Sequence, residues 1–388
     1  MLNSPVLKKL TWFLVVLTLI AGVFGSMLFT ELGQLLNMPS SWLYAVYPNL
    51  GWASMVIALV AVFVLYQHFK HGLIKRRLVI GYAVVIAGTI FVTNFFVPDV
   101  WLRGHHHTAN FVPIAEVDTL LDSDADVFVL EINGEARAYP RDWMMLPHIA
   151  GDTVGGEEVA MTYCALSNLP LAFSSSIEGE EANLKVVSQV HNNLVMVDNN
   201  TGELYQQITA SSPGKSKTLD PRAAQRMPWH SFKKLYPDGK VFRVVEKGPY
   251  AWIDKITYAL FVQGLEPHYN GPDPLFPTLN LDDDRLPIKE KIWGINIGNE
   301  QVAYALSYLQ KQPIHNTTIG GKPVVVVWSP EYETLGVFSR VINGDTIEVS
   351  NIDVYGNTSK GKLKRLPQYP HVFWMVWSHW YPQTKVMG

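Results

Sequence analysis

The sequence predicts a bundle of three N-terminal transmembrane helices joined to one large, mostly-β extracytoplasmic domain with short helices. Three long uncharged stretches lie within the first 98 residues, and strand-like segments bounded by turn residues fill the remainder, parts of which recur at a fixed spacing. We therefore divide the chain into membrane helices over 1–98, a juxtamembrane linker leading into the domain over 99–126, a first repeat over 127–290 and a second, shortened repeat over 291–388.

Each uncharged stretch is long enough to cross a hydrocarbon core of about 30 Å as a helix. They cover 10–30, 42–66 and 78–98. A buried helix of a soluble protein can also be apolar on all sides, but three such helices in succession favour membrane spans. The first stretch is longer than the apolar core of a signal peptide, and no clear small-x-small cleavage site follows it, so we expect it to be retained as a membrane helix.

Basic residues in the short loops predict the orientation of these helices. Lys and Arg precede the first span and fill the loop between the second and third, at Lys8, Lys9, Lys70, Lys75, Arg76 and Arg77. The loop over 31–41 contains neither. By the positive-inside rule the N-terminus is cytoplasmic. We expect a multi-pass protein of the bacterial inner membrane, with the lipid bilayer as its partner and the large C-terminal domain outside the cytoplasm.

Composition excludes several classes of site. The single cysteine, Cys164, rules out an intramolecular disulfide, so the domain must be stabilised by its own buried core. The net charge of −3 gives no basic face for nucleic acid. The sequence also has no glycine-rich phosphate loop and no nucleophile elbow.

The large domain contains an internal repeat. Positions 127–173 align with 292–338 without a gap, which we call the first register. Positions 236–241 align with 381–386 at a smaller separation, which we call the second register, so the second copy is shorter between the two. Residues identical between the copies cluster at turns and strands: Glu135 and Glu300, Ala138 and Ala303, Tyr139 and Tyr304, Gly155 and Gly320, Gly156 and Gly321, Phe173 and Phe338. We expect two pseudo-equivalent β-rich halves packed into one domain, because neither looks complete alone.

Reactive side chains differ between the copies, and this difference locates a candidate site in the first repeat. His148 matches Pro313 and Cys164 matches Ser329, while His191 and Met196 fall where the second copy is shortened. The candidate catalytic residues are therefore Cys164, His191 and His148, and the candidate metal ligands are the same three residues with Met196.

The chemistry of this set suggests a thiol or a transition metal. The Cys164 thiolate suits a nucleophile or a soft metal ligand, and histidines beside it would lower its pKa or share the metal. His191 and Met196 have the ligand types that copper prefers, although they point opposite ways on a regular strand. The structural alternative is a small buried thiol, a core methionine and hydrogen-bonded histidines.

Three further patterns have a structural and a functional interpretation each. The segment 105–107, three histidines, is either a metal- or pH-responsive group or a solvated linker. The three aspartates at 282–284 offer oxygen ligands but lack the alternating spacing of a calcium loop, which favours a solvated turn. The aromatic residues over 373–381 follow helical spacing, which favours packing in the core over docking on the membrane surface.

From about Phe111 to the C-terminus, the sequence resembles the bacterial domain of unknown function family 3179. The resemblance rests on 131–140 (Glu-Ile-Asn-Gly-Glu-Ala-Arg-Ala-Tyr-Pro), 152–156 (Asp-Thr-Val-Gly-Gly), 162–164 (Thr-Tyr-Cys), Asn192, 194–198 and 284–290 (Asp-Arg-Leu-Pro-Ile-Lys-Glu). Family members usually have a second cysteine where this chain has Ser167, and commonly a tyrosine where it has His191. The missing cysteine argues against a Cys-x-x-Cys role, and the resemblance implies no established activity.

We therefore carry two hypotheses. The first is a membrane-anchored extracytoplasmic module that binds a ligand or assembles with a partner, which is a protein or a small molecule. The alternative is a metal-dependent or thiol enzyme that uses the Cys/His cluster of the first repeat. The two differ in whether Cys164, His191 and His148 converge on one pocket.

Overall fold

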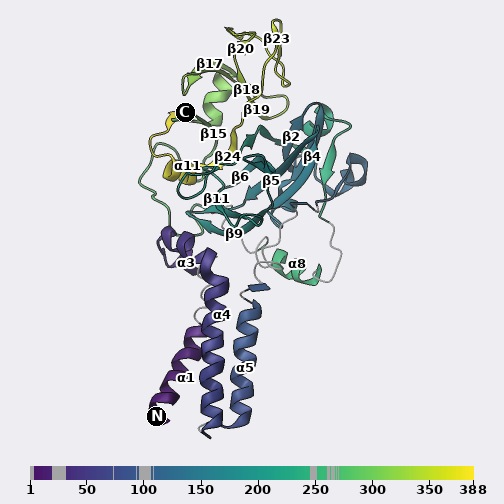
Figure 1. Cartoon of the computed structure of the whole chain (residues 1–388). Helices are drawn as coiled ribbons and strands as arrows, with labels where there is room; N and C mark the ends of the chain where they lie inside the picture. The colour runs from purple at the N-terminus through teal and green to yellow at the C-terminus, as the bar shows by residue number, and fades with distance from the viewer. Residues whose placement is uncertain are drawn as a thin grey trace. The chain divides into compact units, whose positions relative to one another are not determined.

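The computed structural model describes residues 4–19, 32–72, 74–92, 94–95, 106–107, 109–244, 251–259, 263, 267, 269 and 271–388. The chain forms two compact units. The first consists of 1–103 with the short pieces 187–190 and 276–278, and the second contains the rest. The second unit is a mostly-β domain with short helices, as predicted (Figure 1).

The first unit is helical. Its described helices are α1 (Ser4–Leu19), α3 (Leu32–Leu35), α4 (Ser40–Lys70) and α5 (Arg76–Phe91). Within the described ranges, α4 is the one helix long and apolar enough to cross a membrane, and it contains Pro48. Large apolar side chains on it remain exposed, among them Leu59 at 69 % and Phe63 at 61 %.

The other two expected spans are described only in part. The first, over 10–30, coincides with the end of α1 and continues into residues outside the described ranges. The third, over 78–98, coincides with α5 up to Phe91, and most of its remainder also lies outside them. The described helices therefore give one helix of spanning length, where the sequence predicted three.

The β domain has a first half, 111–244, and a second half, 279–388. The main strands of the first half are β1 (Phe111–Pro113), β2 (Asp126–Ile132), β3 (Glu135–Pro140), β4 (Ile149–Val154), β5 (Glu157–Cys164), β6 (Leu169–Ser174), β12 (Pro221–Arg222), β13 (Ala224–Pro228) and β14 (Lys240–Phe242). They form a five-stranded sheet in the order β1-β14-β3-β2-β13 and a four-stranded sheet in the order β12-β6-β5-β4. A further sheet, in the order β11-β10-β9, consists of β9 (Leu184–Val190), β10 (Asn193–Asp198) and β11 (Leu204–Gln206).

The second half has two main sheets with the same pairing pattern, besides two small two-stranded sheets. Its main strands are β15 (Lys291–Ile297), β16 (Glu300–Tyr304), β17 (Ile314–Ile319), β18 (Lys322–Ser329), β19 (Thr334–Ser339), β24 (Tyr369–Phe373) and β25 (Lys385–Met387). They are ordered β24-β15-β16-β25 and β17-β18-β19. Short helices accompany both halves: α6 (Arg141–Met144), α7 (Trp229–Leu235), α10 (Leu306–Lys311) and α11 (Trp374–Trp380).

The elements of the second half follow those of the first in the two registers. In the first register, the bounds of β2, β4, β5 and β6 coincide with those of β15, β17, β18 and β19. In the second register, the bounds of β13, α7 and β14 coincide with those of β24, α11 and β25. The strand pairings also correspond: β14 runs parallel to β3, and β25 runs parallel to β16. The three strands β9 to β11 lie where one register gives way to the other.

The same correspondence extends upstream of residue 127. The Trp229 indole N–H donates to Asp118 Oδ1 at 3.0 Å, and the indole N–H of Trp374, its match in the second register, donates to the carbonyl oxygen of Asp283 at 3.3 Å. Asp118 and Asp283 match in the first register. Because β1 also pairs with β14, the β domain already includes Phe111, which lies within the region that the sequence assigned to a linker.

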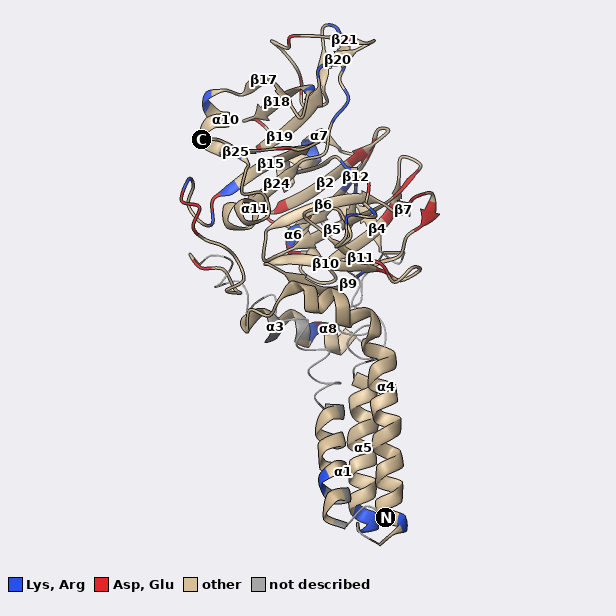
Figure 2. Ribbon diagram, turned by 60° about the vertical axis from the view of Figure 1, so that its left-hand side comes forward, with Lys and Arg blue, Asp and Glu red and all other residues tan. Residues whose placement is uncertain are grey.

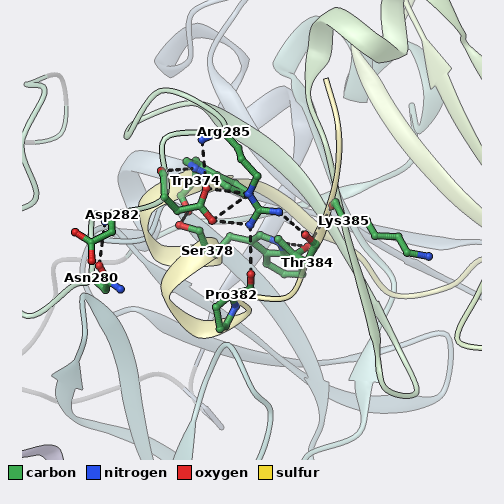
Figure 3. Close-up of polar contacts among 10 residues, drawn as sticks. Asn280, Asp282, Arg285, Trp374, Ser378, Pro382, Thr384 and Lys385 are labelled. Carbon is green, nitrogen blue, oxygen red and sulfur yellow. Dashed lines mark hydrogen bonds and ion pairs between the residues drawn. The ribbon is translucent and has the colours of Figure 1, made fainter.

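Arg285 attaches the start of the second half to α11 (Figure 3). Its guanidinium donates to Asp283 Oδ1 at 2.9 Å and to the Thr384 carbonyl at 2.7 Å, and it lies 5.1 Å from the centre of the Trp374 ring. The hydrogen bond from Arg285 lowers the pKa of Asp283. Asp283 is thus held in an ion pair, not left in the solvated turn that the sequence favoured.

The aromatic residues near the C-terminus belong to the core. Trp374 and Trp377 are fully buried, as is Trp229 at the matched position of α7. The Trp377 indole N–H donates to Thr384 Oγ1 at 2.9 Å. Packing in the core, which the helical spacing favoured, is confirmed for these residues, and docking of Trp374 and Trp377 on a membrane surface is wrong.

We predict that two matched glycines are required equally for stability. Gly155 (φ +56°) and Gly320 (φ +54°) adopt left-handed conformations in which a Cβ would meet the carbonyl oxygens of Ile132 and Ile297. Changing either to Ala should cost at least about 2 kcal/mol, because the backbone must also move. The neighbouring Gly156 and Gly321 face open space, so Ala there should cost about 1 kcal/mol from the backbone conformation alone. Thermal and urea unfolding of the four variants measures the difference, and equal losses at all four positions would refute it.

Candidate functional site

A cavity of about 450 Å³ lies within the β domain and is lined by residues from both halves. The first half contributes Asp124, Asp126 and Arg226, and the second half contributes among others Lys291, Trp293 and His371. We call this space the open cavity. It lies where the edge of the first five-stranded sheet faces the start of β15 and the middle of β24.

A buried ion pair forms one wall of the open cavity. Arg226, on β13, is only 2 % exposed, and its Nε donates to Asp126 Oδ1 at 2.7 Å, while Nη2 also bonds the same carboxylate. The guanidinium lies 5.5 Å from the centre of the Phe128 ring. Burial alone would raise the pKa of Asp126, but Arg226 holds it below its usual value, so both groups are charged.

Asn168 connects this ion pair to the second half. Its Oδ1 accepts hydrogen bonds from Arg226 Nη1 at 2.9 Å, from the Tyr269 hydroxyl at 2.8 Å and from the Tyr163 hydroxyl at 3.2 Å. Its Nδ2 donates to the His371 carbonyl at 2.8 Å. Asn168 has a φ of +55°, a conformation that asparagine tolerates better than most residues. The network therefore joins β13, the turn between β5 and β6, and β24.

The charged residues of the open cavity occupy matched positions in the two halves. Arg226 and His371 match in the second register and lie in the middle of β13 and β24. Asp126 and Lys291 match in the first register and begin β2 and β15. His371 packs against Trp293 with ring centres 4.5 Å apart, and burial, together with the nearby Arg226, lowers the pKa of its imidazole. The carboxylate and guanidinium of one half thus correspond to an ammonium and a neutral imidazole in the other.

Cys164 lies at the end of β5 in the interior, 2 % exposed. Its Sγ is 3.7 Å from the Asn192 carbonyl oxygen, and burial raises the pKa of the thiol. Nearby polar side chains form hydrogen bonds with one another, and Gln207 Nε2, for example, donates to Thr162 Oγ1 at 2.8 Å. A buried thiol with a raised pKa is a poor source of thiolate, so these surroundings favour the structural interpretation of Cys164.

His148, another candidate, also lies in the interior. Burial lowers the pKa of its imidazole to about 4. Its Nδ1 has no hydrogen-bond partner among the described residues, and its carbonyl accepts the Tyr163 N–H at 2.8 Å. His148 is therefore a neutral imidazole beside β5.

His191 packs against α11, a contact that the sequence did not suggest. Its ring centre is 4.5 Å from that of His379 and 5.7 Å from that of Trp380. His379 Nδ1 accepts the Asn280 N–H at 2.9 Å, and burial and the neighbouring His191 lower the pKa of His379 to about 4. Met196 is fully buried on β10, opposite Tyr205.

The backbones of these candidates lie near one another, because the His148 carbonyl bonds the residue before Cys164 and the Cys164 Sγ lies beside the residue after His191. Across the described ranges, no three His, Cys, Asp or Glu side chains are grouped so that they could hold a metal ion. His106, which the sequence favoured as part of a solvated linker, is only 5 % exposed, with Nε2 3.0 Å from Ser175 Oγ and Nδ1 accepting the Leu184 N–H at 3.0 Å. His105 lies outside the described residues.

Sequence reasoning missed Asp126, Arg226, Asn168, Lys291 and His371. The repeat contained a signal for four of these residues. The two registers align Arg226 with His371 and Asp126 with Lys291, and the side chain differs in chemical type within each aligned pair. These changes are exchanges of charge within strands, whereas the sequence criterion for the site was the thiol and the imidazoles of the first copy. A charged residue within a buried strand usually has a partner, and that rule could have identified Arg226.

Comparison with known proteins gives a family and no relative of known activity. The family model described as "Protein of unknown function (DUF3179)" matches residues 98–384. No curated protein and no solved structure matches the chain.

We predict that Cys164→Ser lowers stability without changing metal content. A serine hydroxyl costs more to bury than a thiol, and its shorter bond to Cβ draws it away from the Asn192 carbonyl oxygen that lies 3.7 Å from the Sγ atom, so the free energy of unfolding should fall by about 1–3 kcal/mol. Urea unfolding and elemental analysis of the full-length protein and the variant measure both quantities. Unchanged stability together with a metal that is bound by the parent protein and lost from the variant would restore the metal-site interpretation.

Proposed function

We propose that this chain, which belongs to the DUF3179 family, is a membrane-anchored extracytoplasmic module that binds a small-molecule ligand in the open cavity. The observation that carries the proposal is a cavity of about 450 Å³ with a buried, fully neutralised ion pair in its wall. Ligand sites in proteins have this size and combine apolar walls with a few fixed polar groups.

The polar groups of the open cavity support binding better than catalysis. Arg226 is satisfied by Asp126 and Asn168, so it shapes the wall without an exposed charge of its own. Trp293 is 2 % exposed and lines the cavity, and its indole N–H has no partner among the described residues. Unsatisfied buried donors are uncommon in native proteins, and a ligand or water that accepts this hydrogen bond would account for it.

The thiol or metal enzyme has less support. Burial raises the pKa of Cys164, and the ring of His191 packs against His379. A nucleophile needs a base within hydrogen-bond reach, and the group that lies 3.7 Å from the Cys164 Sγ is the Asn192 carbonyl oxygen, which is not a base. We therefore retain ligand binding as the proposed function.

The helical unit supports the membrane anchor. α4 has spanning length, and the exposed faces of α4 and α5 are apolar, including Leu59, Phe63 and Val84. Lys and Arg, blue in Figure 2, gather at the end of these helices where the chain begins, and the rest of the helices is almost free of charge. We propose three spans with this basic end in the cytoplasm and the β domain outside.

We further propose that the β domain arose by duplication of one unit. The support is the recurrence of strand bounds, pairings and side-chain contacts in the two registers. Even the hydrogen bond between Gly155 N–H and Glu135 Oε2, 3.1 Å, has a counterpart between Gly320 and Glu300 at 2.8 Å.

Topology can be tested with a reporter that is active only outside the cytoplasm. Fused after Gly388, it should be active, and inserted into the basic loop over 70–77, it should be inactive. The reason is the excess of Lys and Arg in that loop. Activity in the reverse pattern would place the β domain in the cytoplasm and overturn the orientation.

Ligand binding can be tested by blocking the open cavity. Gln310 is exposed on α10 and lines the cavity, whereas its neighbour Lys311 is exposed and does not line it. Gln310→Trp should abolish the binding of cavity ligands from a fragment set without lowering the melting temperature, and Lys311→Trp should leave binding intact. Ligand-observed NMR on the full chain in detergent provides the measurement. No fragment binding, or equal binding by the parent protein and Gln310→Trp, would contradict the proposal.

A further inference from the structure

The β domain contains a second pocket at the place that matches the open cavity. This pocket has a volume of only about 20 Å³, and its lining includes Met145, Ala165, Lys289, Phe373 and Tyr269. Four of these match residues of the open cavity: Met145 matches Gln310, Ala165 matches Pro330, Lys289 matches Asp124 and Phe373 matches Pro228. The open cavity takes Gln310 and Pro330 from the second half and Asp124 and Pro228 from the first. The Tyr269 pocket takes the matching residues from the opposite halves. We call the smaller one the Tyr269 pocket.

Tyr269, which belongs to neither half, lines the Tyr269 pocket, and the space left beside its ring is only about 20 Å³. Its ring packs against Phe373 with centres 5.4 Å apart, and the Arg141 guanidinium lies 4.9 Å from its ring centre. Its hydroxyl donates to Asn168 Oδ1 at 2.8 Å. A phenol ring therefore lies at the Tyr269 pocket, with its hydroxyl bonded to Asn168 in the turn that follows β5.

The open cavity has the matching acceptor, and no tyrosine is among the described residues that line it. Glu333 lines the open cavity at the position of Asn168, and the two residues share the left-handed backbone, with φ of +48° and +55°. Glu333 is exposed and forms no salt bridge within the described part of the chain. Its carboxylate is a stronger hydrogen-bond acceptor than the Asn168 amide.

From this correspondence we infer that the open cavity binds an aromatic ring with a hydroxyl group, whose hydroxyl donates to Glu333 as the Tyr269 hydroxyl donates to Asn168. The inference rests on the proposed function and specifies its ligand class. The ligand is a phenol, either free or as part of a larger molecule.

The charges of the two pockets specify the remainder of the ligand. Around Tyr269 lie the cations Arg141, Lys289 and Lys291. Lys291 also lines the open cavity, where Leu306 and Asp124 hold the positions that match Arg141 and Lys289. The open cavity thus keeps Lys291 but has an apolar and an acidic residue in place of the other two cations, and its carboxylates, Asp124, Asp126 and Glu333, outnumber its cations, Arg226 and Lys291. A phenol with an ammonium substituent should therefore bind more tightly than a phenol with a carboxylate.

The test uses p-cresol, which reproduces the tyrosine side chain, and the full chain in detergent. The parent protein should bind one equivalent of p-cresol, as measured by NMR titration. Glu333→Ala should weaken this binding about tenfold, the usual scale for a lost charge-assisted hydrogen bond. Glu348→Ala, at an exposed carboxylate away from both pockets, should leave it unchanged. Tyr269→Ala should empty the Tyr269 pocket and raise the stoichiometry to two equivalents.

Two charged probes test the ligand's substituent, and tyramine should bind more tightly than 4-hydroxyphenylacetate. The inference is overturned if p-cresol does not bind the parent protein, if Glu333→Ala binds it as tightly, or if 4-hydroxyphenylacetate binds more tightly than tyramine. If other fragments still bind and Gln310→Trp blocks them, ligand binding stands and only the phenol class falls. If no fragment binding is sensitive to Gln310→Trp, both proposals fall.

Discussion

The β domain depends on the burial of one charge, the guanidinium of Arg226. Burying an isolated cation costs several kcal/mol, and the cost is offset only when a counter-ion and further hydrogen bonds are in place. Here Asp126 supplies the charge and Asn168 supplies an acceptor, and Asn168 in turn bonds the His371 carbonyl of the second half. Because all of these groups must be in position together, the ion pair stabilises the contact between β13 of the first half and β24 of the second, which we call the seam.

The two halves share a backbone plan but differ in the chemistry at their seam. The turns and strand bounds repeat because they depend on local requirements, such as the left-handed glycines at 155 and 320. The seam is free to diverge, and it does so in charge: Asp126 corresponds to Lys291, and Arg226 to His371. The two matching places at the seam differ accordingly, because Tyr269 lines one of them and the other is the open cavity.

Much of the fold could be predicted from the sequence, and little of the site. Strand bounds follow from apolar runs and from turn residues such as Asn133 and Gly134, which act over a few residues. The Asp126–Arg226 pair joins residues 100 positions apart through the pairing of β13 with β2, and no local pattern specifies that pairing. Likewise His106 follows a predicted span, but its burial against Ser175 and Leu184 depends on tertiary packing.

The central claim, that this ion pair stabilises the seam, is tested most directly by a double-mutant cycle of Asp126→Asn and Arg226→Met, measured by urea unfolding. Each single change should cost about 3–5 kcal/mol, because it leaves the other charge buried without its partner. The double variant should cost less than the sum of the two, by at least about 2 kcal/mol. Additive effects, or single losses below about 1 kcal/mol, would contradict the account.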